Sequence, residues 1–328
     1  IVMSPAISRP YRFFGRVIVA LGFVASVGLG VSTLVGAIAG LAAGAMAAAG
    51  AHLIFGSPGG RPSSEQVREV LDELGVRVDH LEPARFEPAG VVLMDATHVD
   101  GRQLTVKVYG RDAWDGQLIA KVWRALWYRN GQHPLLQSRL HQVEQEALLT
   151  VLAERAGTPV PEVLVAGATS RGDAAVVTTA TGPSLAQLLD EGVIVSDRTL
   201  AELWSAVGSA HHNGIVNGGL DLESATLDEA GDVRIGDWSS GSVAASTDTV
   251  DQELAQMLVL AALATSTDRA VASASSALGG ERLGELVPYL QLPALTSGLR
   301  EAIKSRGFEI DALRDAASTA AGIDGVEL

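Results

Sequence analysis

The chain contains no cysteine among its 328 residues. This absence excludes disulfides, cysteine-based metal sites and a thiol nucleophile, and it fits a reducing compartment. Basic residues are also scarce, with 24 Lys and Arg against 38 Asp and Glu. Only three of the basic residues and none of the acidic ones precede residue 57, so the part that follows carries a formal charge of −17. A domain this acidic is repelled by nucleic acid, and we expect no nucleic-acid partner.

Charged residues are missing altogether from Val17 to Phe55. The 39 residues of this run are too many for one membrane span, which needs roughly 20 apolar residues, and about right for two. We therefore predict a transmembrane hairpin at residues 1–56, with helices near 14–31 and 34–55. A signal peptide is the main alternative, but its apolar core is only about 7–15 residues long and is not doubled. A buried pair of soluble helices is disfavoured because neither span offers a polar face.

Basic residues stand on both flanks of this hairpin, which predicts its orientation. Arg9, Arg12 and Arg16 precede it and Arg61 follows it, while the connection between the two spans is uncharged. The positive-inside rule places both flanks in the cytoplasm. We expect a multi-pass protein of the inner (plasma) membrane, with the lipid bilayer as a partner and the acidic domain in the cytoplasm.

The remainder predicts an α+β protein with strands first and helices later. Residues 57–63 form a linker by composition, and a helix begins at Ser63 or Ser64 and runs to about Gly75. The predicted strands cover residues 90–95, 103–109, 163–167, 174–179, 225–228 and 233–237. The predicted helices cover 115–129, 135–156, 184–191, 197–213 and most of 249–321. We expect a small lobe over about 64–179 and a large lobe over about 184–322.

Three stretches carry a resemblance. Residues 104–109 read Leu-Thr-Val-Lys-Val-Tyr, and residues 143–149 read Val-Glu-Gln-Glu-Ala-Leu-Leu. Residues 210–227 read Ala-His-His-Asn-Gly-Ile-Val-Asn-Gly-Gly-Leu-Asp-Leu-Glu-Ser-Ala-Thr-Leu. In this order they resemble the protein-kinase fold, and the third resembles the catalytic loop of small-molecule and lipid kinases. The resemblance implies a two-lobed kinase-like domain in which Lys107 reaches nucleotide phosphates and Glu146, rather than Glu144, is its ion-pair partner.

The same alignment shows losses in the catalytic loop. The loop histidine is replaced by Asn217, the catalytic aspartate by Gly219 and the metal-binding asparagine by Ser224. Glycine can neither orient a substrate hydroxyl nor accept its proton. The resemblance therefore implies a pseudokinase in which no catalytic residue is assigned. An active atypical kinase that uses Asp221 as its base is the alternative.

Other parts of a nucleotide site are suggested by the resemblance. Thr179, Ala180 and Thr181 correspond to the hinge that receives adenine, and Asp237, in Asp237-Trp238-Ser239, corresponds to the magnesium-binding aspartate. We expect ATP and magnesium as cofactors on this basis. A plain capping role at a strand end is the alternative for Asp237. The helix that braces the catalytic loop is expected near residue 251, with Asp251 as its anchor. No glycine-rich phosphate loop is recognisable between Arg61 and Leu104.

A wider resemblance covers essentially the whole chain. The hydrophobic hairpin, the Gly-Ser-Pro-Gly-Gly-Arg-Pro linker and Lys-Val-Trp-Arg-Ala-Leu-Trp-Tyr-Arg at 121–129 resemble actinobacterial integral membrane proteins. In that family a kinase-like N-terminal half precedes a lysylphosphatidylglycerol-synthase-type, flippase-like membrane domain. The resemblance implies that residues 323–328 lead into such a domain, which would be a partner of this chain.

An aromatic and basic cluster stands out in this acidic domain: Trp123, Arg124, Trp127, Tyr128 and Arg129. Aromatic rings with basic neighbours suit a membrane interface or a partner helix. The equally supported alternative is that the two tryptophans, four residues apart, pack on the small lobe. The pair His211-His212 is interpreted as structural, because no third ligand stands at metal-site spacing. A nucleotide-free scaffold remains a further alternative for the whole domain.

Overall fold

The computed structural model describes residues 63–84, 91–109, 139–169, 173–228 and 230–322, with a few single positions between 25 and 43. It is a mixed α+β protein, as the sequence predicted. Its residues form two compact units, one of residues 1–141 and 165–177 and one of residues 142–164 and 178–328. The predicted lobe boundary placed the whole of residues 64–179 together. The contacts instead group residues 142–164 with the second unit.

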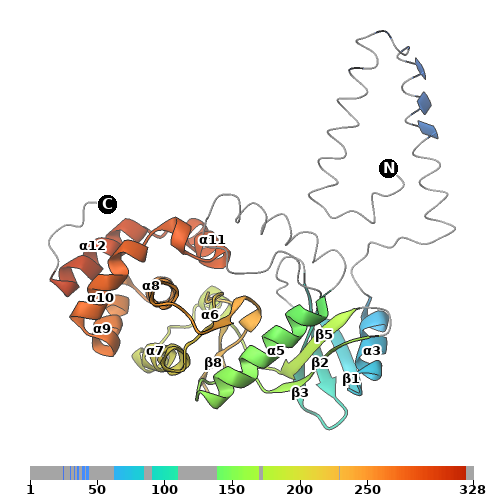
Figure 1. Ribbon diagram of the computed structural model, residues 1–328, viewed down its shortest axis with the longest axis horizontal. Helices are drawn as coiled ribbons and strands as arrows, with labels where there is room; N and C mark the ends of the chain where they lie inside the picture. The colour runs from blue at the N-terminus through green and yellow to red at the C-terminus, as the bar shows by residue number, and fades with distance from the viewer. Residues whose placement is uncertain are drawn as a thin grey trace. The chain divides into compact units, whose positions relative to one another are not determined.

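A five-stranded sheet dominates the first unit, with strand order β1-β2-β3-β5-β4 (Figure 1). The elements are α3 (Ser64–Glu73), β1 (Val78–Pro83), β2 (Val92–His98), β3 (Gln103–Tyr109), β4 (Val163–Ala168) and β5 (Ala174–Thr179). Residues 163–164 of β4 and 178–179 of β5 are grouped with the second unit. The predicted hairpin is present: β2 and β3 pair antiparallel, from Val92 opposite Val108 to Thr97 opposite Gln103. The turn between them contains Gly101, whose φ of 90° favours glycine.

Local signals account for most of these elements. Ser63 begins α3 with a capping box, because its Oγ accepts from Gln66 N–H and Gln66 Oε1 accepts from Ser63 N–H. Strand β1 was missed by the sequence prediction. It lies at the sheet edge, only Val78 and Leu81 of it are buried, and a register shift follows Val78. A strand with so few buried side chains lacks the alternation by which strands are recognised.

The second unit is mostly helical. Its longer helices are α5 (Arg139–Arg155, which enters it at Gln142), α7 (Asp197–His212), α8 (Thr247–Ala264), α9 (Thr267–Leu278), α11 (Ser297–Arg306) and α12 (Ile310–Ala321). Its shorter elements are α6 (Leu185–Asp190), β6 (Ile215–Val216), β7 (Ala225–Leu227), β8 (Val233–Ile235), β9 (Ser242–Val243) and α10 (Gly280–Leu286). Strands β7 and β8 form the second hairpin that the sequence predicted.

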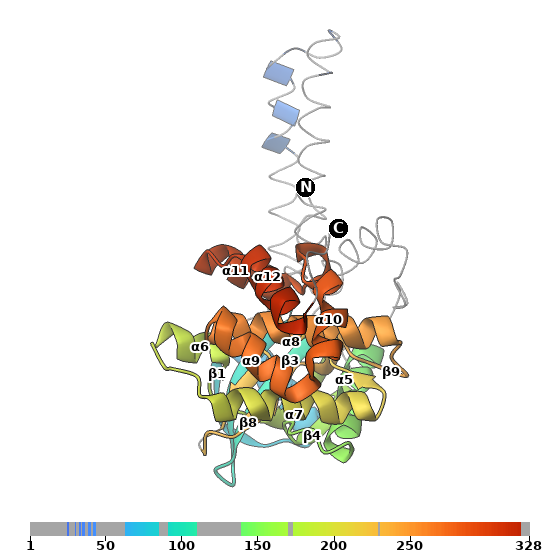
Figure 2. The ribbon, with the colours of Figure 1, turned by 90° about the vertical axis from the view of Figure 1, so that its left-hand side faces the viewer.

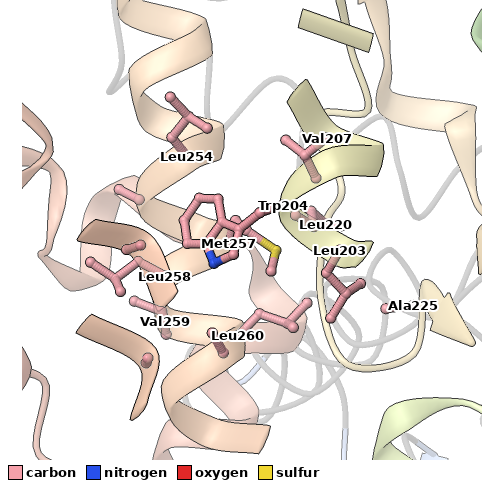
Figure 3. Packing of buried hydrophobic residues seen from close by; sticks show 14 of the residues in the cluster. Leu203, Trp204, Val207, Leu220, Ala225, Leu254, Met257, Leu258, Val259 and Leu260 are labelled. Atoms are coloured by element: carbon pink, nitrogen blue, oxygen red, sulfur yellow. The ribbon is translucent and has the colours of Figure 1, made fainter. Parts of the chain in front are cut away.

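Helix α8 is the centre of this unit. Every residue from Glu253 to Ala264 is buried, as expected for a helix that is apolar on all sides. Helices α7, α9, α10, α11 and α12 contact it, and Figure 2 shows several of them grouped around α8. Trp204 of α7 packs near Met257 and Leu258 of α8 (Figure 3), while its indole N–H donates to Ser273 Oγ of α9 at 3.1 Å. Burial of each such side chain contributes roughly 1.5–3 kcal/mol.

Two predicted features lie outside the described residues. The hairpin at 1–56 does so apart from isolated positions, and so does the helix predicted at 115–129 with its aromatic and basic cluster. Among the helices that are described, none combines the length and the hydropathy that a membrane span requires.

Candidate functional site

The segment that resembles a catalytic loop is anchored to α8 by the buried side chain of Glu253. Its Oε1 accepts the backbone N–H of Asn217 at 3.1 Å, and its Oε2 accepts the N–H of Gly218 at 2.6 Å. The same Oε1 lies 2.9 Å from Nε2 of His211, which is itself nearly buried on α7. One carboxylate thus joins the loop, α7 and α8. His211 acts as a structural residue in this arrangement, as predicted.

Asp251 was predicted as the anchor, and this prediction is wrong. Asp251 and Glu253 are two positions apart, so about 200° of helical rotation separates their directions, and only one of them can face the loop. Asp251 instead forms an ion pair with Arg282 of α10. The Asp-x-Glu spacing in α8 was the available signal, and the glutamate is the residue that reaches the loop amides.

Asn217 fastens the loop to the chain that follows β8. Its side-chain Nδ2 donates to the carbonyls of Gly236 at 3.1 Å and Asp237 at 3.2 Å, and its Oδ1 accepts from Gly219 N–H at 3.1 Å. The residue is 2% exposed, and both ends of its amide are used. Asn217 therefore positions the neighbourhood of Gly219 and Asp237.

The two glycines of the loop differ in what they permit. Gly218 has φ of 70°, and a Cβ there would strike the carbonyl oxygen of Ser240. Gly219 does not have a positive φ, and a Cβ there would lie 3.6 Å or more from its neighbours, an ordinary contact distance. Gly218 is required by the backbone. Gly219 is not, so a side chain could be accommodated where the resemblance expects the catalytic aspartate.

Asp221, the alternative base, is turned toward its own loop. Its Oδ1 accepts the backbone N–H groups of Glu223 at 3.0 Å and Ser224 at 2.9 Å. Ser224 Oγ accepts from Asp221 N–H at 2.8 Å and donates to the Asp221 carbonyl at 3.0 Å. The hydroxyl of Ser224 is thus engaged within the turn. These contacts describe a capped turn, and they favour a structural role for both side chains.

The other oxygen of Asp221 lies against the first turn of α11. A Cβ on Gly298 would strike Oδ2 of Asp221, so this carboxylate would have to shift to admit any other residue. Burial raises the pKa of Asp221 above its usual range, and the nearby charge of Asp237 raises it further, although hydrogen bonds from Ser224 and Glu223 oppose the shift.

Asp237 stands in an unusual backbone conformation at the end of β8. Its φ and ψ are 49° and 68°, in the left-handed region, and its Oδ1 accepts from Ser239 Oγ at 2.6 Å. Trp238, which follows it, is buried and donates its indole N–H to the carbonyl of Ile235 at 3.0 Å. Asp237 therefore caps a short turn. Left-handed residues other than glycine cluster at functional sites, which keeps a second role open for this side chain.

Lys107 and Glu146 are both buried, at 8% and 6% exposure. Lys107 lies on β3 in the first unit, with its Nζ 5.5 Å from the ring centre of Tyr109, a cation–π distance. Glu146 lies on α5 in the second unit, where its carbonyl accepts from Thr150 Oγ1 at 2.8 Å. A buried charge costs free energy unless polar groups compensate it. We therefore infer that the side chains of Lys107 and Glu146 each make a specific polar interaction.

The three predicted hinge residues line a cavity of about 430 Å³ within the second unit. Thr179 pairs with Glu162 twice, since its N–H donates to the Glu162 carbonyl at 2.9 Å and its Oγ1 accepts from Glu162 N–H at 3.0 Å. Gly182 follows with φ of 84° and lies directly against the carbonyl of Leu227. The hinge segment is thereby held to Glu162, just before β4, on one side and to β7 on the other. Among the described residues, no group of three or more His, Asp or Glu side chains could hold a metal ion.

Comparison with known proteins gives few relatives by sequence. No family model and no curated protein matches the chain. Solved structures that resemble it are kinases. Vaccinia related kinase 3 shares 17% identity over 49% of this chain and 48% of its own, with a TM-score of 0.30. The kinase WbdD, in complex with a kinase inhibitor, shares 14% identity over 76% of this chain and 46% of its own, with a TM-score of 0.37.

A structure described as the bifunctional kinase-methyltransferase WbdD shares 13% identity over 76% of this chain and 47% of its own, with a TM-score of 0.40. The chain spans about half the length of these structures. Superpositions at this level carry no argument of their own. The kinase-like interpretation therefore rests on the order of the elements and on the residues of the loop between His211 and Ser224.

Proposed function

We propose that this chain is a non-catalytic, kinase-like module that binds ATP with magnesium and transfers no phosphoryl group. The observation that carries the proposal is the state of the loop at residues 217–224. Glu253 and Asn217 hold it through a connected set of hydrogen bonds, yet its catalytic position is Gly219. A loop kept in register without its carboxylate fits a scaffold that retains the shape of a kinase site.

The rival base, Asp221, is poorly suited to activate a substrate. A general base must reach the proton that it abstracts, within about 2.6–3.2 Å or through one water. Both oxygens of Asp221 already face protein, one toward two backbone N–H groups and the other toward Gly298. Phosphoryl transfer by Asp221 would require this turn to open.

The proposed nucleotide contacts are Lys107 for the phosphates, Glu146 as its partner and Asp237 for one magnesium ion, with residues 179–181 at the adenine. The burial of Lys107 and Glu146 and the left-handed backbone of Asp237 support a specialised role for these three positions. The chain would bind one magnesium ion and not two, because Ser224 stands in place of the second metal ligand and its hydroxyl is engaged in the turn.

Two measurements on the 328-residue chain test this proposal. The first is thermal unfolding with and without ATP and magnesium, in which ligand at 100 times its Kd stabilises by about 2.7 kcal/mol. The second is release of labelled phosphate in the presence of candidate acceptors. We expect stabilisation without turnover. Phosphate release that disappears in Lys107→Ala would overturn the proposal that the chain is non-catalytic. If the release also disappears in a folded Asp221→Asn variant, Asp221 is the catalytic base.

A matched pair of variants isolates the metal site. Asp237→Gly removes the carboxylate while glycine adopts the left-handed conformation without strain. Asp237→Asn keeps the turn-capping oxygen and also tolerates this conformation. We expect both variants to fold and to lose stabilisation by ATP with magnesium. If the parent chain itself shows no stabilisation by ATP, the nucleotide-free scaffold is the better description.

Membrane attachment through residues 1–56, and regulation of a lipid-handling membrane domain that follows residue 328, complete the proposal. Support comes from the uncharged run Val17–Phe55 and from the arginines on its flanks. Fractionation of cells that express the chain tests the first point. We expect the chain in the inner membrane after an alkaline wash, and recovery in the wash itself would contradict attachment by a hairpin.

A further inference from the structure

The cavity lined by residues 179–181 also carries charged side chains that the nucleotide proposal does not use. It measures about 430 Å³, within the range of roughly 300–1,000 Å³ that is usual for small-ligand sites. Its wall carries one cation, Arg234 of β8, and three carboxylates, Glu154, Glu162 and Asp228. All of these residues belong to the second unit.

Arg234 has donors to spare. One terminal nitrogen donates to Asp228 Oδ2 at 3.2 Å and the other to the carbonyl of Val160 at 3.4 Å, both long for charge-assisted bonds. A guanidinium has five N–H donors, and its side chain here is 40% exposed. Arg234 therefore offers an anchored fork for one carboxylate of a ligand.

The carboxylates are of two kinds. Asp228 is already satisfied, because its Oδ1 accepts from the backbone N–H groups of Ala230 and Asp232 and its Oδ2 accepts from Arg234. Glu154 and Glu162 are exposed, and neither side chain has a polar partner among the described residues. The backbone of Glu162 is held in place by Thr179. The wall thus pairs a guanidinium with two uncompensated negative charges.

We propose that this cavity binds a small zwitterion of the amino-acid type, with its carboxylate on Arg234 and its ammonium group toward Glu162 and Glu154. Arg234 is held at the carbonyl of Val160, two residues before Glu162, so a ligand on the guanidinium lies beside the segment that carries Glu162.

The charges around the site also decide against simpler ligands. A phosphate would approach three carboxylates on its way to Arg234, and a lone amine would leave the spare donors of the guanidinium unused. Val160, Pro161 and Ala180 complete the wall. This site shares residues 179–181 with the proposed adenine contacts, but none of its charged residues is among the proposed ATP contacts.

Equilibrium dialysis of the full chain with labelled L-leucine tests the proposal, with ethylamine and propionate as separate competitors. We expect saturable binding that L-alanine displaces and that neither competitor displaces at the same concentration. Glu162→Gln and Arg234→Lys should each weaken binding by about tenfold or more, because each removes a charge-assisted contact. Glu301→Gln, on the exposed face of α11, serves as the matched control and should leave binding unchanged.

Several results would overturn the proposal. Absence of saturable L-leucine binding would do so directly, as would displacement by ethylamine alone. Equal binding by the parent, Glu162→Gln and Arg234→Lys chains would show that leucine binds elsewhere. Glu162→Gln keeps the test decisive if loss of the Arg234 contacts unfolds the β7–β8 hairpin. Leucine binding is measured without ATP, and Glu162→Gln and Arg234→Lys alter none of the proposed ATP contacts, so failure of this proposal is distinguishable from failure of the nucleotide proposal.

Discussion

The carboxylate of Asp221 lies against the α-carbon of Gly298, so that the catalytic-loop segment and the first turn of α11 fit together only because residue 298 has no side chain. Gly298 itself is within α11, where alanine would otherwise be preferred by about 1 kcal/mol. Glycine at position 298 weakens α11 slightly, but it leaves room for the Asp221 carboxylate and so allows α11 to pack beneath the loop.

Gly298→Ala should destabilise the protein. The added methyl group overlaps Oδ2 of Asp221, and such overpacking typically costs about 1–3 kcal/mol. Gly208→Ala in α7 is the control, because a Cβ there meets nothing within 4 Å and should stabilise by about 0.5–1 kcal/mol. Urea unfolding of the two variants measures both effects. Equal changes would contradict the close fit of Asp221 and Gly298.

Substitution by alanine should destabilise the protein much more at Gly218 than at the adjacent Gly219. Gly218→Ala forces a left-handed conformation and a collision with the Ser240 carbonyl, at a cost of about 2–4 kcal/mol. Gly219→Ala meets only ordinary contacts and should change stability by less than about 1 kcal/mol. Chemical denaturation of the pair checks this. A large loss in Gly219→Ala would mean that glycine is needed there for the backbone.

Glu253→Gln should be among the more damaging single changes in the second unit. An amide can replace only part of the carboxylate, and its NH₂ group would face backbone N–H donors, so we expect a cost of about 3–5 kcal/mol. Hydrogen exchange gives the specific readout, since protection of the Asn217 and Gly218 amides should fall. Asp251→Asn is the comparison, and it should leave these two amides protected because its partner is Arg282.

The stability difference between Asp221→Asn and the parent should depend on pH. Burial raises the pKa of Asp221, so the folded state binds the carboxyl proton more tightly than the unfolded state does. The resulting stabilisation of the folded state is fully present below the pKa that Asp221 has in the unfolded chain. It is lost as pH rises through the raised pKa of the folded state. Asparagine can accept the same two N–H groups without ionising. The variant should therefore gain stability relative to the parent from pH 4 to pH 7, and a constant difference in urea titrations would argue against burial of the charge.

Much of the fold was predictable because the signals are local. Serine caps precede α6, α7 and α8, and β3 and β5 coincide with the predicted strands. Strand β1 was not predictable in this way, since its place depends on pairing with β2 at the sheet edge. The predicted lobe boundary depended on chain order, whereas the grouping of α5 depends on which residues it contacts.

The candidate site divides along the same line. The candidate roles of Lys107 and Gly219 followed from the order of residues along the chain, through the resemblance to the kinase fold. The identity of the loop anchor did not follow from the sequence. Asp251 and Glu253 both carry a carboxylate, and the direction in which each projects from α8 decides which one reaches the loop. The sequence could not single out Arg234 either, because this residue belongs to no motif and only the structure shows the cavity that it lines.

By itself, the sequence determined the acidic charge, the uncharged run before residue 56 and the α+β order of elements, and it placed Gly219 where the kinase resemblance expects an aspartate. These depend on residue types and on spacing along the chain. Only the tertiary structure decided that Glu253 holds the loop, that Asp221 is committed to its own turn and to Gly298, and that Arg234 and Glu162 share a cavity. Such relationships join residues tens of positions apart, and they arise from packing that no local pattern encodes.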